Sequence, residues 1–274
     1  MAGSKILYVC QEITPYLPPT DMSTECRMLV QAMQERGCET RTFMPRYGVI
    51  NERRNQLHEV IRLSGMNLII DDNDHQLIIK VASIPSARVQ IYFIDNDDYF
   101  ARKAVLCDAA NGGAMFPDND ERAIFFARGV LETVRKLRWT PTVVHCHGWF
   151  SAVMPIYLRN TFAEDPMFHD VKIAVSLYDD AFPGTLSGDF RQKLESEGIS
   201  GEALSVLDEP SYENLMKLVI EYADGIVVRS GNLSPQVKQA VEEAAAAGKR
   251  VLGWQPADAP DYLDNYRKFY DELV

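Results

Sequence analysis

Short apolar runs that alternate with segments of helical periodicity are the sequence feature that most limits the fold of this chain. Residues 6–10 are a short apolar run, and apolar residues then recur at helical spacing over 22–33 until Gly37 ends the helix. Residues 40–44 can form the next strand, and a strand, a helix and a returning parallel strand make the right-handed α/β crossover. The sequence therefore predicts an α/β fold with a Rossmann-like parallel sheet flanked by helices.

The same alternation continues along the chain, with two interruptions. The later elements are predicted in the order helix 118–136, strand 143–146, helix 151–160, strand 172–177, helix 214–222, strand 225–228, helix 236–247 and strand 250–253. Asp118 and Glu121 have the spacing of a capping box at the start of the first of these helices. Short runs separated by turn-forming residues predict a small antiparallel β insertion over 60–94, and residues 183–210 predict a long surface excursion.

The end of the chain predicts an amphipathic helix that must cover another surface. Its apolar stripe at helical periodicity consists of Tyr262, Leu263, Tyr266, Phe269, Tyr270 and Leu273. We expect this helix, 261–274, to pack back on the sheet. Because no repeat or linker divides the chain, we predict a single domain over residues 1–274.

The charge of the chain limits the class of its partners. Its 28 Lys and Arg against 39 Asp and Glu give a net charge of -11, which repels nucleic acid and anionic membrane surfaces. No apolar stretch reaches the length of a membrane span. The five cysteines form no CxxC pair and fit a reducing compartment, so the sequence predicts a cytoplasmic protein.

Two histidines, His145 and His147, stand where a predicted strand ends, which is where open α/β sheets bind ligands. A metal site would need a further ligand, and the remaining histidines lie in predicted loops or surface segments: His58, His75 and His169. We therefore predict no metal. The pair can instead hydrogen-bond a hydroxyl or phosphate of a ligand, or serve only the packing around Trp149, and the sequence leaves both alternatives open.

Two other strand ends carry features that bear on ligand binding. Asp95 and Asn96 follow a predicted strand and suit sugar hydroxyls or a cation, with a solvated turn as the alternative; the pattern of an EF-hand is absent. The first turn, 11–21, is the usual place for a glycine-rich phosphate loop, but it contains prolines, which lack N–H donors, and no glycine. No GxSxG elbow or P-loop is present to support a hydrolase or a kinase.

Several segments together resemble the N-terminal catalytic domain of bacterial glycogen synthases and plant starch synthases, over residues 4–235. These segments are 12–16, 35–39, 44–48, 93–96, 116–122, 144–149, 155–158 and 221–224. The family has the GT-B fold and transfers glucose from ADP-glucose to an α-1,4-glucan. The resemblance implies that His147 and Asp95 are catalytic, and we expect no cofactor. It implies that the following residues bind substrate: Tyr16, Asn96, His145, Trp149, Tyr178 and Asp179.

The chain departs from the family where the family does its chemistry. The donor loop of the family falls on 18–24, where its lysine is Pro18 and its aspartate is Thr24. An Asp and a His of the family's His-rich motif are Gly148 and Phe150 here. The family also has a second domain, which binds most of the nucleotide-sugar, and we expect no counterpart in this chain.

These departures predict a domain of the glycogen synthase type that is catalytically degenerate as a lone domain. The alternative is a non-enzymatic module that binds a glucan or a metabolite, or a regulatory partner of an enzyme. The expected ligand is a glucan or a nucleotide-sugar, and the expected protein partner is another protein or a second copy of this chain.

Overall fold

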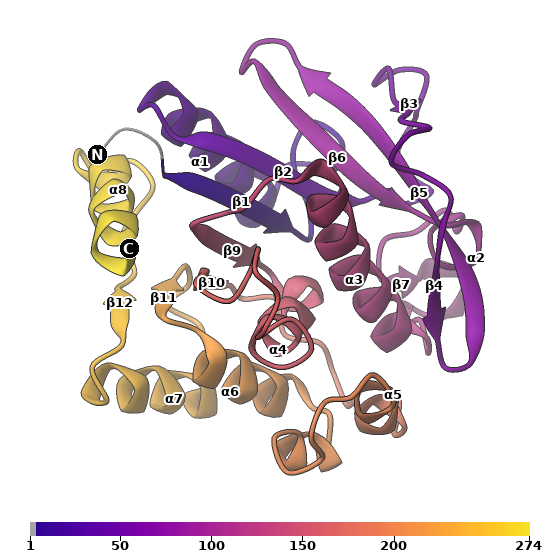
Figure 1. Cartoon of the computed structure of the whole chain (residues 1–274). Coiled ribbons are helices and arrows are strands. Elements are labelled where there is room, and N and C mark those ends of the chain that lie inside the picture. Colours follow the sequence, from indigo (N-terminus) through magenta and orange to yellow (C-terminus); the bar gives the residue numbers. More distant parts are fainter. Residues whose placement is uncertain (1–3) are drawn as a thin grey trace.

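The computed structural model describes residues 4–274 and is built on a mostly parallel sheet (Figure 1). Its strands lie in the order β12-β11-β10-β9-β1-β2-β6-β5-β3. The parallel strands are β1 (Lys5–Cys10), β2 (Glu39–Pro45), β6 (Val89–Asp95), β9 (Val143–His147), β10 (Lys172–Leu177), β11 (Gly225–Val228) and β12 (Arg250–Leu252). The predicted α/β fold with a parallel, helix-flanked sheet is therefore confirmed.

The helices cover both faces of the sheet because the chain reverses its direction of travel between β1 and β9. With right-handed crossovers, the β1–β2 connection places α1 on one face, and the connections from β6 to β12 place their helices on the other. The main helices are α1 (Asp21–Glu35), α3 (Asn119–Leu137), α4 (Val153–Arg159), α6 (Tyr212–Tyr222), α7 (Pro235–Ala246) and α8 (Tyr262–Leu273).

The antiparallel insertion exists, but the last strand predicted for it is also paired in parallel with a strand of the main sheet. Strands β3 (His58–Glu59), β4 (Met66–Ile70) and β5 (Asn73–Ile84) are antiparallel to their neighbours. Strand β6 pairs antiparallel with β5 on one side and parallel with β2 on the other, with Ile91 opposite Thr42. The local pattern of residues 89–94 resembles that of the preceding antiparallel strands. Their parallel pairing with β2 cannot be recognised from that pattern, because β2 lies far away in the sequence.

Short elements fill the connections. They are α2 (Asp97–Phe100), β7 (Cys107–Asp108), β8 (Ala114–Met115), α5 (Phe190–Ser196) and the 3₁₀ turns η1 (Ala109–Asn111), η2 (Trp149–Ser151) and η3 (Ser205–Asp208). The predicted excursion 183–210 is ordered by α5, because the buried Lys193 on this helix bonds Asp120 and Glu121 at the start of α3, at 2.8 Å each.

Helix α8 lies on the part of the sheet that α1 leaves uncovered (Figure 1). Its Tyr270 reaches His145 on β9, and its Phe269 packs against Gly225 on β11. Three tyrosines and a phenylalanine of the stripe are buried: Tyr262, Tyr266, Tyr270 and Phe269. The helix thus removes from water an apolar face that would otherwise be a large exposed patch. Within residues 4–274, no helix has the length and apolar character needed to cross a membrane.

Candidate functional site

The carboxyl edge of the parallel sheet is the place to look for a ligand site, because the strand order reverses there between β1 and β9. The segments that follow these strands are the proline-rich loop 11–20 after β1 and the turn at Gly148 after β9. Tyr178 to Asp180 follow β10, and Arg229 follows β11. A ligand site at this edge would therefore be formed by side chains and backbone groups of these four segments.

The N-terminus of α1 is closed by its own cap. The backbone N–H of Thr20 donates to Ser23 Oγ at 2.8 Å, and the N–H of Ser23 donates to Thr20 Oγ1 at 3.0 Å. The Thr20 hydroxyl also donates to the carboxylate of Glu12, whose pKa is raised by desolvation. A carboxylate and a side-chain cap thus stand where a helix N-terminus would otherwise attract a phosphate.

His145 is sealed between the sheet and α8. Its side chain is fully buried, with Nδ1 2.6 Å from the hydroxyl of Tyr270 and Nε2 2.8 Å from the hydroxyl of Ser176. Burial lowers the pKa of His145 well below its ordinary value, so the ring is neutral. Both nitrogens have protein partners, and no group of three or more His, Cys, Asp or Glu within residues 4–274 could hold a metal ion.

His147 lies beside His145, with ring centroids 4.0 Å apart, and is also fully buried. Its Nδ1 is 2.9 Å from the hydroxyl of Tyr178, and its Nε2 has no hydrogen-bond partner among the described residues. The end of β9 is covered closely, since a Cβ at Gly148 would lie 2.8 Å from both Gln11 Oε1 and Met22 Sδ. The histidine that the resemblance makes catalytic therefore lies beneath the surface of the carboxyl edge.

A carboxyl group that the sequence analysis did not single out lies next to these residues. Asp180 is half-buried and accepts hydrogen bonds from the N–H of Trp149 at 2.8 Å and the hydroxyl of Tyr212 at 3.0 Å. Desolvation raises its pKa to about 6. Its neighbour Asp179, the predicted substrate residue, is exposed, and the ring of Trp149 is buried 4.7 Å from that of Phe182.

The Asp180→Asn variant should reveal this raised pKa as a pH dependence of stability. The folded protein takes up a proton near pH 6, whereas the unfolded chain does so near pH 4. The wild type should therefore gain about 1 kcal/mol relative to the variant as the pH falls from 7 to 5. Urea unfolding at both pH values measures the difference. Asp179→Asn is the matched control for the loss of one charge, and an equal pH response in both variants would contradict the assignment.

Asp95 and Asn96 form part of a separate group at the end of β6. This strand lies three positions from β9 in the sheet, roughly 14 Å away. Asp95 is buried and paired with Arg46 Nε at 2.8 Å and Lys80 Nζ at 2.9 Å. Asn96 caps α2, and its amide donates to a backbone carbonyl of β5. Tyr16 is buried with its ring edge-on to Phe93.

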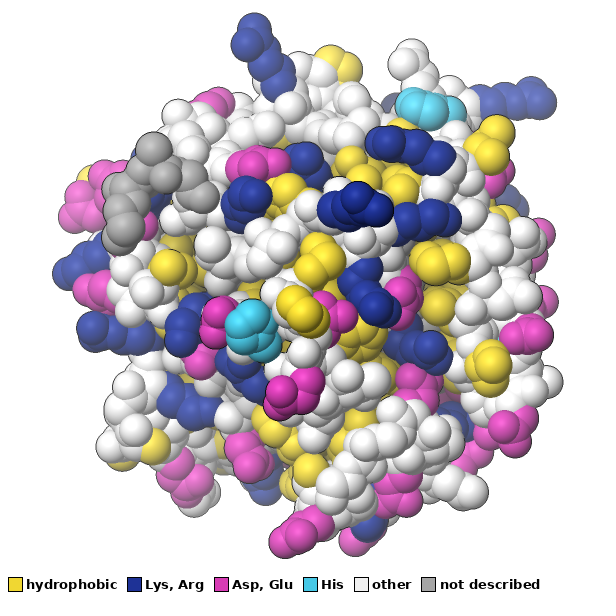
Figure 2. Space-filling model, in the orientation of Figure 1, with side chains coloured by type: hydrophobic (Ala, Val, Ile, Leu, Met, Phe, Trp, Pro, Cys, Tyr) yellow, Lys and Arg dark blue, Asp and Glu magenta, His cyan; other side chains and the backbone are white. Residues whose placement is uncertain are grey.

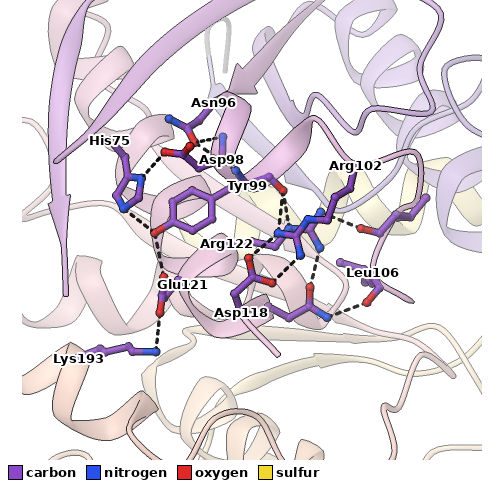
Figure 3. Close-up of polar contacts among 12 residues, drawn as sticks. His75, Asn96, Asp98, Tyr99, Arg102, Leu106, Asp118, Glu121, Arg122 and Lys193 are labelled. Atoms are coloured by element: carbon purple, nitrogen blue, oxygen red, sulfur yellow. Dashed lines mark hydrogen bonds and ion pairs between the residues drawn. The ribbon is translucent and has the colours of Figure 1, made fainter. Parts of the chain in front are cut away.

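The segment 116–122 contributes a polar network that the sequence analysis did not foresee (Figure 3). The hydroxyl of Tyr99 donates to Glu121 at 3.0 Å and lies 2.9 Å from His75 Nε2, while Lys193 donates to the other oxygen of Glu121. The fully buried Arg122 donates to the carbonyl of Tyr99 at 2.8 Å, and desolvation lowers its pKa to about 10. The only sequence signal for this network is the resemblance of the segment to the family.

The predicted capping box at the start of α3 does not form. Asp118 stands at the N-cap without a side-chain hydrogen bond to the helix and instead forms a bidentate pair with Arg102, with one bond of 2.8 Å. Glu121 is held by Tyr99 and Lys193. The spacing suits a cap, but partners from elsewhere in the chain take both carboxylates: Arg102 in the loop after α2 binds Asp118, and Tyr99 and Lys193 bind Glu121.

Comparison with known proteins places these features in a family. The profile of the family described as "Starch synthase catalytic domain" matches residues 5–247. The chain belongs to this family. Glycogen synthase of Chlorobium limicola is 35% identical over 226 residues, which are 82% of this chain and 45% of that protein. Glycogen synthase of Chlorobium phaeobacteroides is 32% identical over 245 residues, which are 89% of this chain and 49% of that protein.

Among solved structures, the catalytic domain of starch synthase IV from Arabidopsis thaliana, bound to ADP and acarbose, has the same fold. It superposes with a TM-score of 0.73 at 15% identity over 92% of this chain and 51% of that chain. This starch synthase-type domain thus spans about half the length of the relatives that it matches.

Proposed function

We propose that this starch synthase-type domain binds an α-glucan and does not by itself transfer glucose from ADP-glucose. The closed N-terminus of α1 carries this proposal. In the family, by resemblance, the donor loop falls on residues 18–24. Here this stretch offers Pro18, Pro19 and a reciprocal cap between Thr20 and Ser23, with the carboxylate of Glu12 bonded to the cap. A diphosphate at this point would find two prolines without N–H donors and the N–H groups of Thr20 and Ser23 already used, and it would meet a negative charge.

The arginines near the carboxyl edge also favour this proposal, because they are already paired with carboxylates. Transfer from a nucleotide-sugar requires positive groups that stabilise the departing diphosphate. Arg229, after β11, has its Nη2 3.4 Å from the buried Glu25, and Arg46 is paired with Asp95. Lys and Arg side chains gather over α3 on the face drawn in Figure 2. The last turn of α3, with the exposed Arg135 and Lys136, lies at the opposite edge of the sheet from the donor loop.

A neutral glucan needs neither the phosphate-binding N–H groups nor the free cations that a diphosphate requires. Its binding needs hydrogen bonds and apolar contact but no cation, so a net charge of -11 does not oppose it. The related starch synthase IV was solved with ADP and acarbose, which makes a nucleotide or a sugar the ligand class to test. The proposal places the protein in the cytoplasm, where its five unpaired thiols would remain reduced.

The test is a transfer assay with ADP-glucose and a glucan primer, together with calorimetric titrations of ADP-glucose and of maltooligosaccharides. We expect no transfer above a protein-free blank and binding of maltooligosaccharides only. Turnover that His147→Ala abolishes would overturn the proposal and favour an active transferase in which His147 and Asp95 act as the resemblance implies. Absence of both turnover and sugar binding would also overturn it, in favour of a regulatory partner of an enzyme.

A further inference from the structure

Strand β12 is the last strand at one edge of the sheet, and its outer side is unpaired. It binds β11 in parallel, with Arg250 opposite Gly225, and within the described part of the chain no strand lies on its other side. Figure 1 shows β12 at the rim of the molecule, between α7 and α8. Such an edge exposes backbone N–H and C=O groups that can pair with a further extended segment.

A groove runs along this open edge. It has a volume of about 510 Å³ and is lined by the end of α7, by β12 and by one side of α8. Arg250 is exposed, and Val251 and Leu252 are half-buried, whereas the central strand β9 is buried throughout. Both ends of the strand are open, because a Cβ at Gly248 or Gly253 would meet no heavy atom within 4 Å. An extended segment can therefore reach β12 from outside.

The charge of this groove is opposite to that of the whole protein. The side chains of Arg250 and Lys268, 58% and 75% exposed, share one carboxylate, that of Glu272, with N–O distances of 3.6 and 3.9 Å. The further cation of the groove, Lys249, donates to the carbonyl of Ile220 at 2.9 Å and keeps its charge there. On a chain with a net charge of -11, this local excess of positive charge favours a negatively charged partner.

Most of the groove lies outside the part of the chain that matches the family. The match ends at residue 247, before β12 and α8 begin. The groove is therefore formed mainly by residues to which membership of the family gives no role.

We propose that β12 accepts an extended acidic segment of a partner protein, which adds a strand to the edge of the sheet and places its carboxylates beside Arg250 and Lys268. In this mode of recognition, main-chain hydrogen bonds supply affinity and side chains supply specificity. The inference goes beyond the proposed function and depends neither on glucan binding nor on glucosyl transfer.

A second copy of this chain fits the same edge less well. Pairing of two β12 strands brings together two grooves that both carry an excess of positive charge. A strand of three residues also offers little toward the roughly 1,200 Å² that a stable interface buries. The cations that oppose self-pairing are the ones that attract an acidic segment.

Calorimetry with a synthetic octapeptide of alternating glutamate and valine tests the inference on the whole chain. This peptide should bind, and the matching peptide of alternating lysine and valine should not. Lys268→Glu should weaken binding of the acidic peptide by about tenfold at low ionic strength. Lys238→Glu makes the same change of charge at an exposed position of α7 outside the groove, so it should bind the peptide as the wild type does. Equal effects of the two variants would overturn the inference.

N-methylated peptides separate strand addition from simple attraction between charges. A methylated backbone nitrogen cannot donate a hydrogen bond, and alternate residues of an added strand face the edge. Methylating all the glutamates or all the valines should therefore abolish binding in at least one of the two peptides. Binding that survives both changes, or that inorganic phosphate displaces, would reveal an anion site and overturn strand addition. Dimerisation of the free chain that the acidic peptide reverses, measured by analytical ultracentrifugation, would assign the edge to a second copy instead.

Discussion

Lys193→Met should lower the free energy of unfolding by about 3–5 kcal/mol, because it leaves buried carboxylates without their cation. The ammonium group lies 2.8 Å from both Asp120 and Glu121, and the side chains of Lys193 and Asp120 are 5% and 0% exposed. Burial raises the pKa of Asp120 above its ordinary value even with the lysine present. Equilibrium unfolding in urea measures the loss, and limited proteolysis within 183–210 should become faster because α5 loses its attachment to α3.

A matched variant on the same helix gives the control. Arg191→Met removes pairs with Asp208 and Glu195 that are partly open to solvent, so it should cost much less than Lys193→Met. Adding Asp120→Asn to Lys193→Met should recover part of the stability, because it removes one uncompensated charge. If Lys193→Met and Arg191→Met lower the free energy of unfolding equally, the ion pairs of Lys193 with Asp120 and Glu121 are not what holds residues 183–210 in place.

Local periodicity is enough to predict most elements of this fold but not their partners. The strands at 143–147 and 172–177 and the helix over 119–137 follow from patterns within each segment. The parallel pairing of 89–95 with β2 does not, because it joins segments that are far apart in sequence. The cap expected at Asp118 also fails, because Arg102 reaches this carboxylate from the loop after α2.

The candidate site was harder to predict, because the accessibility of its side chains depends on how distant elements bury them. Strand alternation correctly places His145 and His147 on one face, but only the packing of α8 shows that Tyr270 seals His145. After β10, the sequence offers two successive aspartates, and nothing local shows that Asp180 rather than Asp179 turns toward Trp149.

The contact between α8 and the sheet depends on the absence of a side chain at Gly225. A Cβ at Gly225 would lie 2.6 Å from Phe269 Cζ and 2.9 Å from Leu273 Cδ2. Gly225→Val should therefore cost about 3 kcal/mol, the upper end of the usual cost of overpacking, because the helix must move off the strand or the ring must leave its rotamer. Urea unfolding measures the cost, and a rise in acrylamide-accessible tyrosine fluorescence would show that α8 has moved.

The matched control for Gly225 is a glycine in the loop that follows β11. Gly231→Val should be nearly neutral, because a Cβ there meets no heavy atom within 4 Å. Because Tyr270 seals His145, a displaced α8 should also open that histidine to solvent. The ring would then titrate closer to the ordinary value, since burial is the main cause of its lowered pKa. A destabilised Gly225→Val protein in which the NMR titration of His145 is unchanged would show that α8 stays in place and that the strain is absorbed within β11 instead.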